Sequence, residues 1–570
     1  MLSFALKNKA IILLLILSSF SRVLFLDRFP TGITNDELHF VLNSKAVFYR
    51  FTNMAGNWSP LSLNTIPGET SSELPFLVVA PFVGPFPTNL LTARLPYVLF
   101  GTISLLFIFL IVQKISNKQL ALTASLVAAV NPWFFYVTRT SFDAPLALMF
   151  LLAGVYLAIT RPQKIYLSLI PLIFGFYCYI GTKTIWPLLI TILCLYSYFT
   201  SKKRHLFAHL TFLFLGLTFF TFYSQKNFSS SRIGELWFPS SAKITAQVSA
   251  ERNQSLQNPL KPLITNNYTV YLRNFLEKYL NNFSPDIFFI TGDHTFMISL
   301  WKHGYFYHLE FLLMIAGIIY FYIHHRSVLY LLLSLIAISP IPEAIRSDTI
   351  PAYAFHSALQ YPFLSILISG GIFLLSNSLK NKTASYLIIF IYSLSLINFL
   401  DIYFFKYPVF QPEGFNFSRR IISRYLFFKK QITNQPVIFL TPEPDSAFRN
   451  YLFHNNLYLP SNYDLIKTIY HNGGNPIEFD GITFTNKDRQ FGDSPTKTVV
   501  VDQQLTNRSF SPSAVYINHL GDNHRLFAIY NDSVCQDQSL DTFAHNLNLF
   551  DLNIESLPKI DFCSKYISKN

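Results

Sequence analysis

Two adjacent carboxylates, Asp36 and Glu37, are the first candidates for acid–base chemistry in the sequence. They stand about ten residues beyond the first long apolar run, so a chain anchored by that run holds them near a membrane surface. A partly desolvated carboxylate at such a place can take a proton from an acceptor hydroxyl. The structural alternative is a pair at a helix N-terminus, with Asn35 or Asp36 as the cap.

Arg139 and Asp143 form a second candidate group at the junction of two apolar runs. The planar fork of an arginine matches the oxygens of a phosphate. An arginine and an aspartate at this spacing can also form an ion pair within one helical turn. Lys183, Arg346 and His356 stand in or beside short polar segments that we place on the same membrane face. Each of them is either a ligand for an anion or an ordinary surface residue.

The elements that must position these residues are membrane helices. Hydrophobic residues make up 51% of the chain and charged residues 13%, about half the charged fraction of a soluble protein. An apolar run of about 20 residues can cross the bilayer as a helix. We predict about eleven spans, at 8–26, 94–113, 119–138, 144–160, 165–181, 185–200, 206–224, 305–323, 327–341, 357–377 and 384–404.

Two apolar segments need a separate interpretation. The first span has lysines before its apolar core but lacks a small-residue cleavage site, so we predict an uncleaved anchor rather than a signal peptide. Residues 76–92 are also apolar, but prolines interrupt them. We predict that this second segment is interfacial or re-entrant.

Basic residues set the orientation, because short cytoplasmic loops are rich in lysine and arginine. A cytoplasmic N-terminus makes every short inside loop basic, and eleven crossings then put 27–93, 225–304 and 405–570 outside. We therefore predict a multi-pass cell-membrane protein with a transmembrane domain over 1–404 and an extracytoplasmic domain over 405–570. The net charge of +13 follows from these loops and does not indicate nucleic acid as a partner.

The tail from residue 405 has mixed α/β character. Short strands are predicted at 437–440, 481–484, 499–501 and 526–530. The tail shows no glycine-rich nucleotide fingerprint. Cys535 and Cys563 both lie in this tail, and they can pair as a disulfide if it is outside the cytoplasm; two free thiols are the alternative.

An ordered set of motifs resembles a known family. Asp36-Glu37, Ala93-Arg94-Leu95-Pro96 and Asn131-Pro132 running to Arg139 and Asp143 look like the protein O-mannosyltransferase and aminoarabinose-transferase group, which are GT-C type glycosyltransferases of family 39. The stretch from Asn282 to Asp293 looks like the long outer-loop motif of the bacterial members. The resemblance covers about residues 10–405 and implies a GT-C-like helical membrane fold.

The resemblance also implies a reaction. Its donor is a polyprenyl phosphate carrying one sugar, and its acceptor hydroxyl attacks the anomeric carbon with inversion. Asp36 takes the role of base with Glu37 beside it, and Asp143 orients Arg139 or touches the acceptor. Membrane lipid is a partner, and the acceptor is a protein, a lipid or an envelope glycan.

Four residues are expected to bind the donor phosphate. Arg139 and Lys183 would neutralise the leaving group, and Arg346 lies in a later outer loop. His356 stands where relatives often carry an arginine, and a histidine serves there if it is protonated. The sequence shows no compact His/Cys cluster with zinc spacing, so no metal or other cofactor is expected, although some family members bind a divalent metal.

Two other functions remain open at this point. A transporter or flippase for polyprenyl-linked glycans would need charged or broken helices at the membrane midplane, whereas the charges here lie mostly at the outer ends of the spans. An oligosaccharyltransferase or polymerase would move a whole glycan from a diphosphate carrier and would generally rely on a divalent metal.

Overall fold

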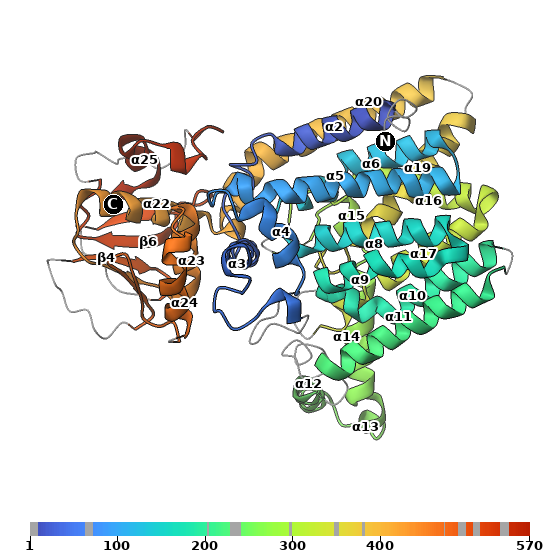
Figure 1. The fold of residues 1–570 in the computed structure, drawn as a ribbon, viewed down its shortest axis with the longest axis horizontal. Helices are drawn as coiled ribbons and strands as arrows, with labels where there is room; N and C mark the ends of the chain where they lie inside the picture. Colours follow the sequence, from blue (N-terminus) through green and yellow to red (C-terminus); the bar gives the residue numbers. More distant parts are fainter. Residues whose placement is uncertain are drawn as a thin grey trace.

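A computed structural model gives the fold of the chain. It describes residues 9–62, 72–201, 204–227, 241–293, 295, 299–346, 353–378, 382–471, 473–487, 497–505, 514–535 and 547–569. The described residues form a helical bundle and a C-terminal α/β unit; some of the short helices lie between the two, and others lie at the edge of the bundle (Figure 1).

Each predicted span contains helix. The bundle consists of α2 (Lys9–Val23), α5 (Leu90–Ile115), α6 (Lys118–Val130) followed by α7 (Pro132–Val137), α8 (Asp143–Thr160), η2 (Pro162–Ser168) followed by α9 (Leu169–Cys178), α10 (Ile180–Thr200), α11 (Leu206–Asn227), α16 (His308–His324), α17 (Arg326–Ile338), α19 (Gln360–Ser378) and α20 (Lys382–Asp401). Among the described residues, six helical stretches are long and apolar enough to cross a membrane, and α6, α16 and α19 are shorter apolar helices. The chain is a multi-pass membrane protein.

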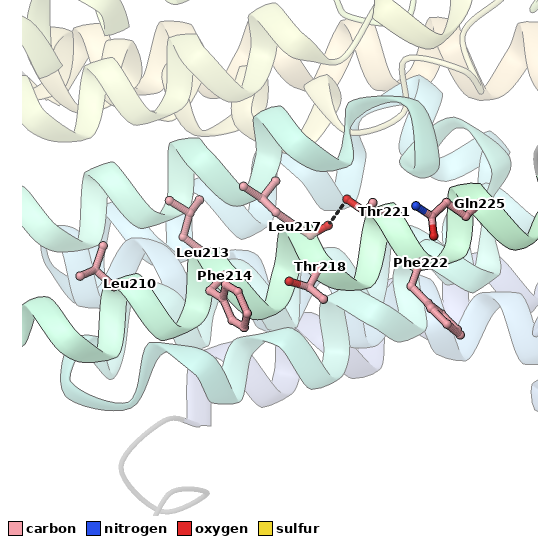
Figure 2. Close-up of a pocket in the computed structure, with 8 residues that line it drawn as sticks. All are labelled: Leu210, Leu213, Phe214, Leu217, Thr218, Thr221, Phe222 and Gln225. Carbon is pink, nitrogen blue, oxygen red and sulfur yellow. Dashed lines mark hydrogen bonds between the residues drawn. The ribbon is translucent and has the colours of Figure 1, made fainter.

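The outward face of α11 is apolar along its length. Eight side chains of this helix line an open groove, shown in Figure 2: Leu210, Leu213, Phe214, Leu217, Thr218, Thr221, Phe222 and Gln225. The groove contains no carboxylate and no cation. A face of this kind suits lipid chains, and it is not a candidate site for chemistry.

Short helices form the outer segments. They are α3 (Asn35–Arg50), η1 (Pro60–Ser62), α4 (Pro75–Val83), α12 (Ala242–Asn253), α13 (Lys261–Ile264), α14 (Asn267–Asn281), α15 (Pro285–Phe289) and α18 (Ile341–Ala344). The proline-rich segment 76–92 begins in α4, which has nine residues. A helix of that length rises only about 14 Å and cannot cross the hydrocarbon core.

A chain of short elements links α20 to the tail: η4 (Ile402–Lys406), α21 (Tyr407–Phe410), η5 (Pro412–Phe415) and α22 (Phe417–Ile432). The tail contains β1 (Val437–Leu440), α23 (Pro444–His454), η6 (Pro460–Asn462), α24 (Tyr463–His471), β2 (Ile477–Phe479), β3 (Ile482–Thr485), β4 (Thr498–Asp502), β5 (Val515–Asn518), β6 (Arg525–Tyr530), η8 (Ile554–Ser556), α25 (Lys559–Tyr566) and β7 (Ser568–Lys569). A helical membrane protein with a C-terminal α/β unit was the predicted fold class, and it is confirmed.

The tail strands form one mixed sheet in the order β2-β3-β1-β4-β6-β5-β7. The central strand β1 pairs in parallel with β3 and β4, so that Val437 lies opposite Ile482 and Thr498. The predicted strand 437–440 matches β1, and three other predictions match β3, β4 and β6 to within one residue at each end. A disulfide joins Cys535 to Cys563, the predicted pair.

The α/β unit packs against the outer helix α3, which lies between it and the bundle (Figure 1). Asn416 Nδ2 donates to the carbonyl oxygen of Ile33 at 3.0 Å, and Ser446 Oγ hydrogen-bonds Asn35 Oδ1. Arg449 contacts Nδ1 of His39 at 3.3 Å. The tail therefore holds the start of α3, where the predicted catalytic acids lie.

Candidate active site

The predicted acids occupy the first turn of α3. Thr34 is the N-cap: its hydroxyl accepts from the Glu37 N–H at 3.1 Å, and Glu37 Oε2 accepts from the Thr34 N–H at 3.0 Å. This reciprocal pair is a capping box. The cap is therefore Thr34 and not Asn35 or Asp36. Asp36 points out of the box and is exposed.

Glu37 is a structural residue, which corrects its predicted place beside the catalytic base. Its side chain is fully buried, and its Oε1 accepts from Arg94 Nε at 3.3 Å and from the Ser141 N–H at 2.8 Å. Arg94 also donates to the carbonyl oxygens of Pro30 and Gly32. Both oxygens of Glu37 are thus used by the protein, which leaves Asp36 as the acid that a substrate can reach.

Gly32, just before the capping box, allows the backbone there to lie directly against the backbone of η5. A Cβ atom built on Gly32 would lie 2.0 Å from the carbonyl oxygen of Phe415, far inside van der Waals contact. Only glycine allows this close approach of two backbones. The start of α3 is thereby fixed against η5.

Arg139, a predicted ligand of the donor phosphate, makes its hydrogen bonds within the chain. It is fully buried, and its guanidinium donates to the carbonyl oxygens of Arg22 at 2.5 Å and Leu24 at 2.9 Å and to the Tyr403 hydroxyl at 3.1 Å. The carbonyls at the end of α2 lack helical partners, and Arg139 supplies donors to them. Arg139 lies in the break between α7 and α8, and Asp143 is the first residue of α8, so the two do not share one helical turn.

Lys183 has a carboxylate partner that the sequence analysis did not identify. Its Nζ lies 2.9 and 2.8 Å from the two carboxylate oxygens of Glu73 and donates to the Tyr223 hydroxyl at 2.8 Å. The Glu73 side chain is 1% exposed and that of Lys183 is 9% exposed. The predicted role of Lys183 in neutralising the leaving phosphate is therefore not supported, because its charge is already balanced.

Arg346 and His356 form one unit with Glu343. The Glu343 carboxylate, which is fully buried, hydrogen-bonds Nδ1 of His356. Arg346 Nη1 lies 2.7 Å from His356 Nδ1, 3.0 Å from His356 Nε2 and 3.8 Å from a carboxylate oxygen of Glu343. His356 and Glu343 therefore position the Arg346 guanidinium. The Arg346 side chain is 26% exposed, and it can still reach a ligand.

Tyr353 marks the point at which these groups converge. Partial burial raises its pKa, the charges of Asp36, Asp293 and Asp143 raise it further, and Arg346 opposes them. The Arg346 guanidinium lies over the Tyr353 ring at 5.9 Å, and the His356 ring is 4.5 Å away. Arg346 and His356 therefore pack against Tyr353, and the charges of Asp36 and Asp143 act on it.

Asp293 holds the loop that bears Tyr353 and His356. One of its carboxylate oxygens accepts from the Ala354 N–H at 3.0 Å and the other from the Thr295 N–H at 2.6 Å. Burial raises the pKa of Asp293. The preceding Gly292 has φ +78°, and a Cβ there would lie 2.5 Å from the carbonyl oxygen of His303, so this turn also requires glycine.

A narrow apolar cavity leads from this site into the bundle. Its volume is about 20 Å³, and it is lined by the first turns of α8 and α10 and by the segments around α18 and α19: Ala144, Ala147, Leu148, Leu151, Tyr179, Gly181, Thr182, Ile185, Ser339, Pro342, His356, Ala358 and Leu359. His356 stands at its polar end, and Asp143 directly precedes its first lining residue. The cavity thus adjoins His356, which contacts Arg346 and Glu343.

Several residues at the site carried only weak sequence signals. The Thr-x-x-Glu pattern of Thr34 and Glu37 is a capping-box signature. It could have identified Thr34 as the N-cap from the sequence. Glu73 had no local pattern that assigned its partner, because Lys183 lies 110 residues away. Glu343 and Arg346 have the i, i+3 spacing of an ion pair, whereas His356, the other partner of Glu343, lies 13 residues away. Among the described residues, one group of three side chains could hold a metal ion; it consists of His519, Asp522 and His524 in the tail.

Comparison with known proteins gives distant structural likenesses only. No protein-family model and no curated protein matches the chain. ArnT from Cupriavidus metallidurans in the apo state has a TM-score of 0.44 and 9% identity over 92% of this chain and 98% of that chain. The structure of ArnT bound to undecaprenyl phosphate has a TM-score of 0.42 and 10% identity over the same shares.

The oligosaccharyltransferase of Archaeoglobus fulgidus, tethered with an acceptor peptide, has a TM-score of 0.41 and 9% identity. The match covers 79% of the present chain, which spans 64% of the length of that protein. Because these likenesses are distant, we infer the function from the residues of the site.

Proposed function

We propose that the chain is a GT-C type membrane glycosyltransferase that moves one sugar from a polyprenyl-phosphate donor to an extracytoplasmic hydroxyl, with inversion. The observation that supports this most is the cluster of Arg346, Tyr353 and His356 beside an apolar cavity that His356 lines. The charges of Asp36 and Asp143 act on the same tyrosine. A carboxylate base, a cation and an apolar path are what transfer from a lipid phosphate requires.

Asp36 is the proposed base. As the acceptor oxygen bonds to the anomeric carbon, its proton passes to the Asp36 carboxylate. The bond between the anomeric carbon and the phosphate oxygen breaks on the opposite face, and its electron pair leaves with the polyprenyl phosphate. Asp36 suits this role because it is exposed, whereas the adjacent Glu37 is enclosed by Arg94 and Ser141.

Arg346 is the proposed ligand for the leaving phosphate. It is proposed in place of Arg139 and Lys183 because those two side chains are buried, whereas the Arg346 side chain, although paired with Glu343 at 3.8 Å, is 26% exposed. His356 and Glu343 hold the Arg346 guanidinium in one orientation, so little reorganisation is needed as negative charge develops on the phosphate. Asp143, at the start of α8 and half-buried, is placed to contact the acceptor or the sugar.

The apolar cavity is the proposed path of the first isoprenoid units. At about 20 Å³ it has room for about one water molecule. A polyprenyl chain therefore enters only when the lining helices separate. The small residues Ala144, Ala147 and Gly181 on the facing walls make such a movement sterically easy.

The test is complementation of cells that lack this protein, with mass spectrometry of their membranes. Wild-type chain should remove the accumulated lipid-phosphate sugar and restore the glycosylated acceptor. Asp36→Asn should restore neither, because loss of a general base lowers the rate by about 10²–10⁴-fold. Asp464→Asn is the matched control, since Asp464 is an exposed acid in the first turn of α24.

Two results would contradict the proposal. Full complementation by Asp36→Asn would remove the base from the mechanism. Movement of polyprenyl-linked glycan across reconstituted vesicles, without any product of sugar transfer, would instead indicate a transporter.

A further inference from the structure

The turn between β5 and β6 brings together two histidines and an aspartate in the pattern His-x-x-Asp-x-His. Nδ1 of His519 lies 2.9 Å from Asp522 Oδ1, and Nδ1 of His524 lies 2.6 Å from the same oxygen. The two imidazole rings are stacked with their centroids 4.9 Å apart. Three side chains that can each bind a metal thus face one point.

The backbone of the turn holds these side chains in place. The His519 N–H donates to the carbonyl oxygen of His524 at 2.8 Å, which closes the hairpin. Asn523 has φ +59°, a left-handed conformation that asparagine tolerates. Because the first and last ligands are thereby paired across the hairpin, their rings project from the same end of the sheet.

We propose that His519, Asp522 and His524 form a zinc site. Imidazole nitrogen and carboxylate oxygen are common zinc ligands, bound at about 2.0–2.2 Å. The three donor atoms lie within 4.8 Å of one another, and two ligands of a tetrahedral zinc ion are about 3.4 Å apart at those bond lengths. Side-chain movements of about 1–1.5 Å therefore complete the coordination.

The exposure of the ligands indicates the remaining coordination. The His524 and Asp522 side chains are 55% and 64% exposed, whereas that of His519 is 12% exposed. Three protein ligands leave a fourth tetrahedral position, which water takes from the solvent side. The site thus has an open side and needs no further residue of this chain.

The position of the turn suggests what the ion would do. Gly521, in the middle of the turn, lies so close to α21 that a Cβ would come within 2.9 Å of the carbonyl oxygen of Val409. α21 belongs to the link between the last membrane helix and the sheet. Zinc would stiffen the turn against this link, and none of its three ligands is among the residues proposed for the transfer reaction.

Zinc titration of the purified full-length chain tests the site. After treatment with a chelator, wild-type protein should bind one equivalent of Zn²⁺ more than the variant His519→Ala/His524→Ala. Co²⁺ in place of Zn²⁺ should give the visible absorption of a tetrahedral site in wild-type protein and none from this site in the variant. His471→Ala is the matched control, because His471 is an exposed histidine of the same unit.

The same Zn²⁺ stoichiometry and affinity in wild type and double variant would overturn the proposal. Should the double variant not fold, the single variant His524→Gln, at the more exposed histidine, replaces it and must bind Zn²⁺ at least about tenfold more weakly. The result is independent of glycosyl transfer, so it stands or falls separately from the proposed function.

The site also affects how chelation experiments are interpreted. A diphosphate-dependent oligosaccharyltransferase would lose activity on chelation, but so would an enzyme whose tail is stabilised by zinc. Chelation in the His519→Ala/His524→Ala background separates these cases, because only a metal at the reaction site remains to be removed.

Discussion

Asp36 and Glu37 are neighbours in the chain, yet the fold treats their charges in opposite ways. Glu37 is fully buried and bound by Arg94, the Ser141 N–H and its own capping box. Asp36 is exposed at the same helix start and lies close enough to Tyr353 to raise its pKa. Two adjacent acids can therefore have different roles. The partners of the carboxylate oxygens distinguish an acid that stabilises the fold from an acid that a substrate can reach.

The cations divide in the same way. Arg139 is enclosed by backbone carbonyls, and Lys183 is paired with Glu73. The Arg346 side chain is one quarter exposed, and His356 contacts its guanidinium. We call Glu37, Arg94, Arg139, Lys183 and Glu73 the scaffold group. Variants on both sides of this division test whether it holds.

The largest effect is expected from breaking the scaffold group. Glu37→Gln leaves the Arg94 charge buried without its counterion, and removal of one partner of a buried pair costs about 3–5 kcal/mol. We expect the variant to unfold or to lose most of its folded yield in detergent, measured by size-exclusion chromatography and thermal melting. Asp36→Asn, one residue earlier, should keep the wild-type melting temperature.

Equal melting temperatures for Glu37→Gln and wild type would show that the Glu37 charge is not needed by the scaffold. The division between the two acids would then have no energetic basis, even though their geometries differ.

The next effect concerns activity without stability. Arg346→Met should lower sugar transfer by about 10²–10³-fold, as does loss of one preorganised donor to a developing oxyanion. Its melting temperature should stay close to that of wild type, because Arg346 is partly exposed. Arg326→Met is the control, since Arg326 is an exposed arginine at the start of α17.

Normal transfer by Arg346→Met would return the phosphate role to another cation. A loss of folded protein without any specific loss of activity would instead move Arg346 into the scaffold group.

Much of the fold was predictable from the sequence, because membrane spans are long and apolar. The predicted spans all contain helix, and the strand at 437–440 was predicted to the residue. Strands β2, β5 and β7 were missed. They are short, and their pairing partners decide them more than their own composition does.

The candidate site was predictable only in part. Asp36, Asp143, Arg346 and His356 were identified by residue type and position. The sequence did not identify which cations pair with buried groups of the fold. Glu73 and Lys183, for example, meet through a contact between distant segments. The pattern His-x-x-Asp-x-His was also missed, since it differs from the zinc-finger spacings that were sought.

The smallest effect on stability is expected at Lys45 on α3. This cation is buried, and among the described residues its hydrogen bonds go to carbonyl oxygens and not to a carboxylate. Its Nζ donates to the carbonyl oxygens of Val83 at 3.4 Å, Gly84 at 3.3 Å and Phe86 at 2.6 Å. Burial lowers the pKa of Lys45 to about 8. Lys45 thus tests whether a buried cation of this region needs a counterion or only backbone carbonyl acceptors.

The pKa of Lys45 is lower in the folded protein than in the unfolded chain. At a pH between these two pKa values the unfolded chain binds more protons, so the free energy of unfolding rises with pH in that range. Relative to Lys45→Met, wild-type stability should therefore rise by about 1 kcal/mol between about pH 7.5 and 9. Thermal melting of both proteins across this range measures the difference. Parallel pH profiles would show that Lys45 keeps an ordinary pKa, and that carbonyl oxygens alone hold a charged lysine as well as a carboxylate does.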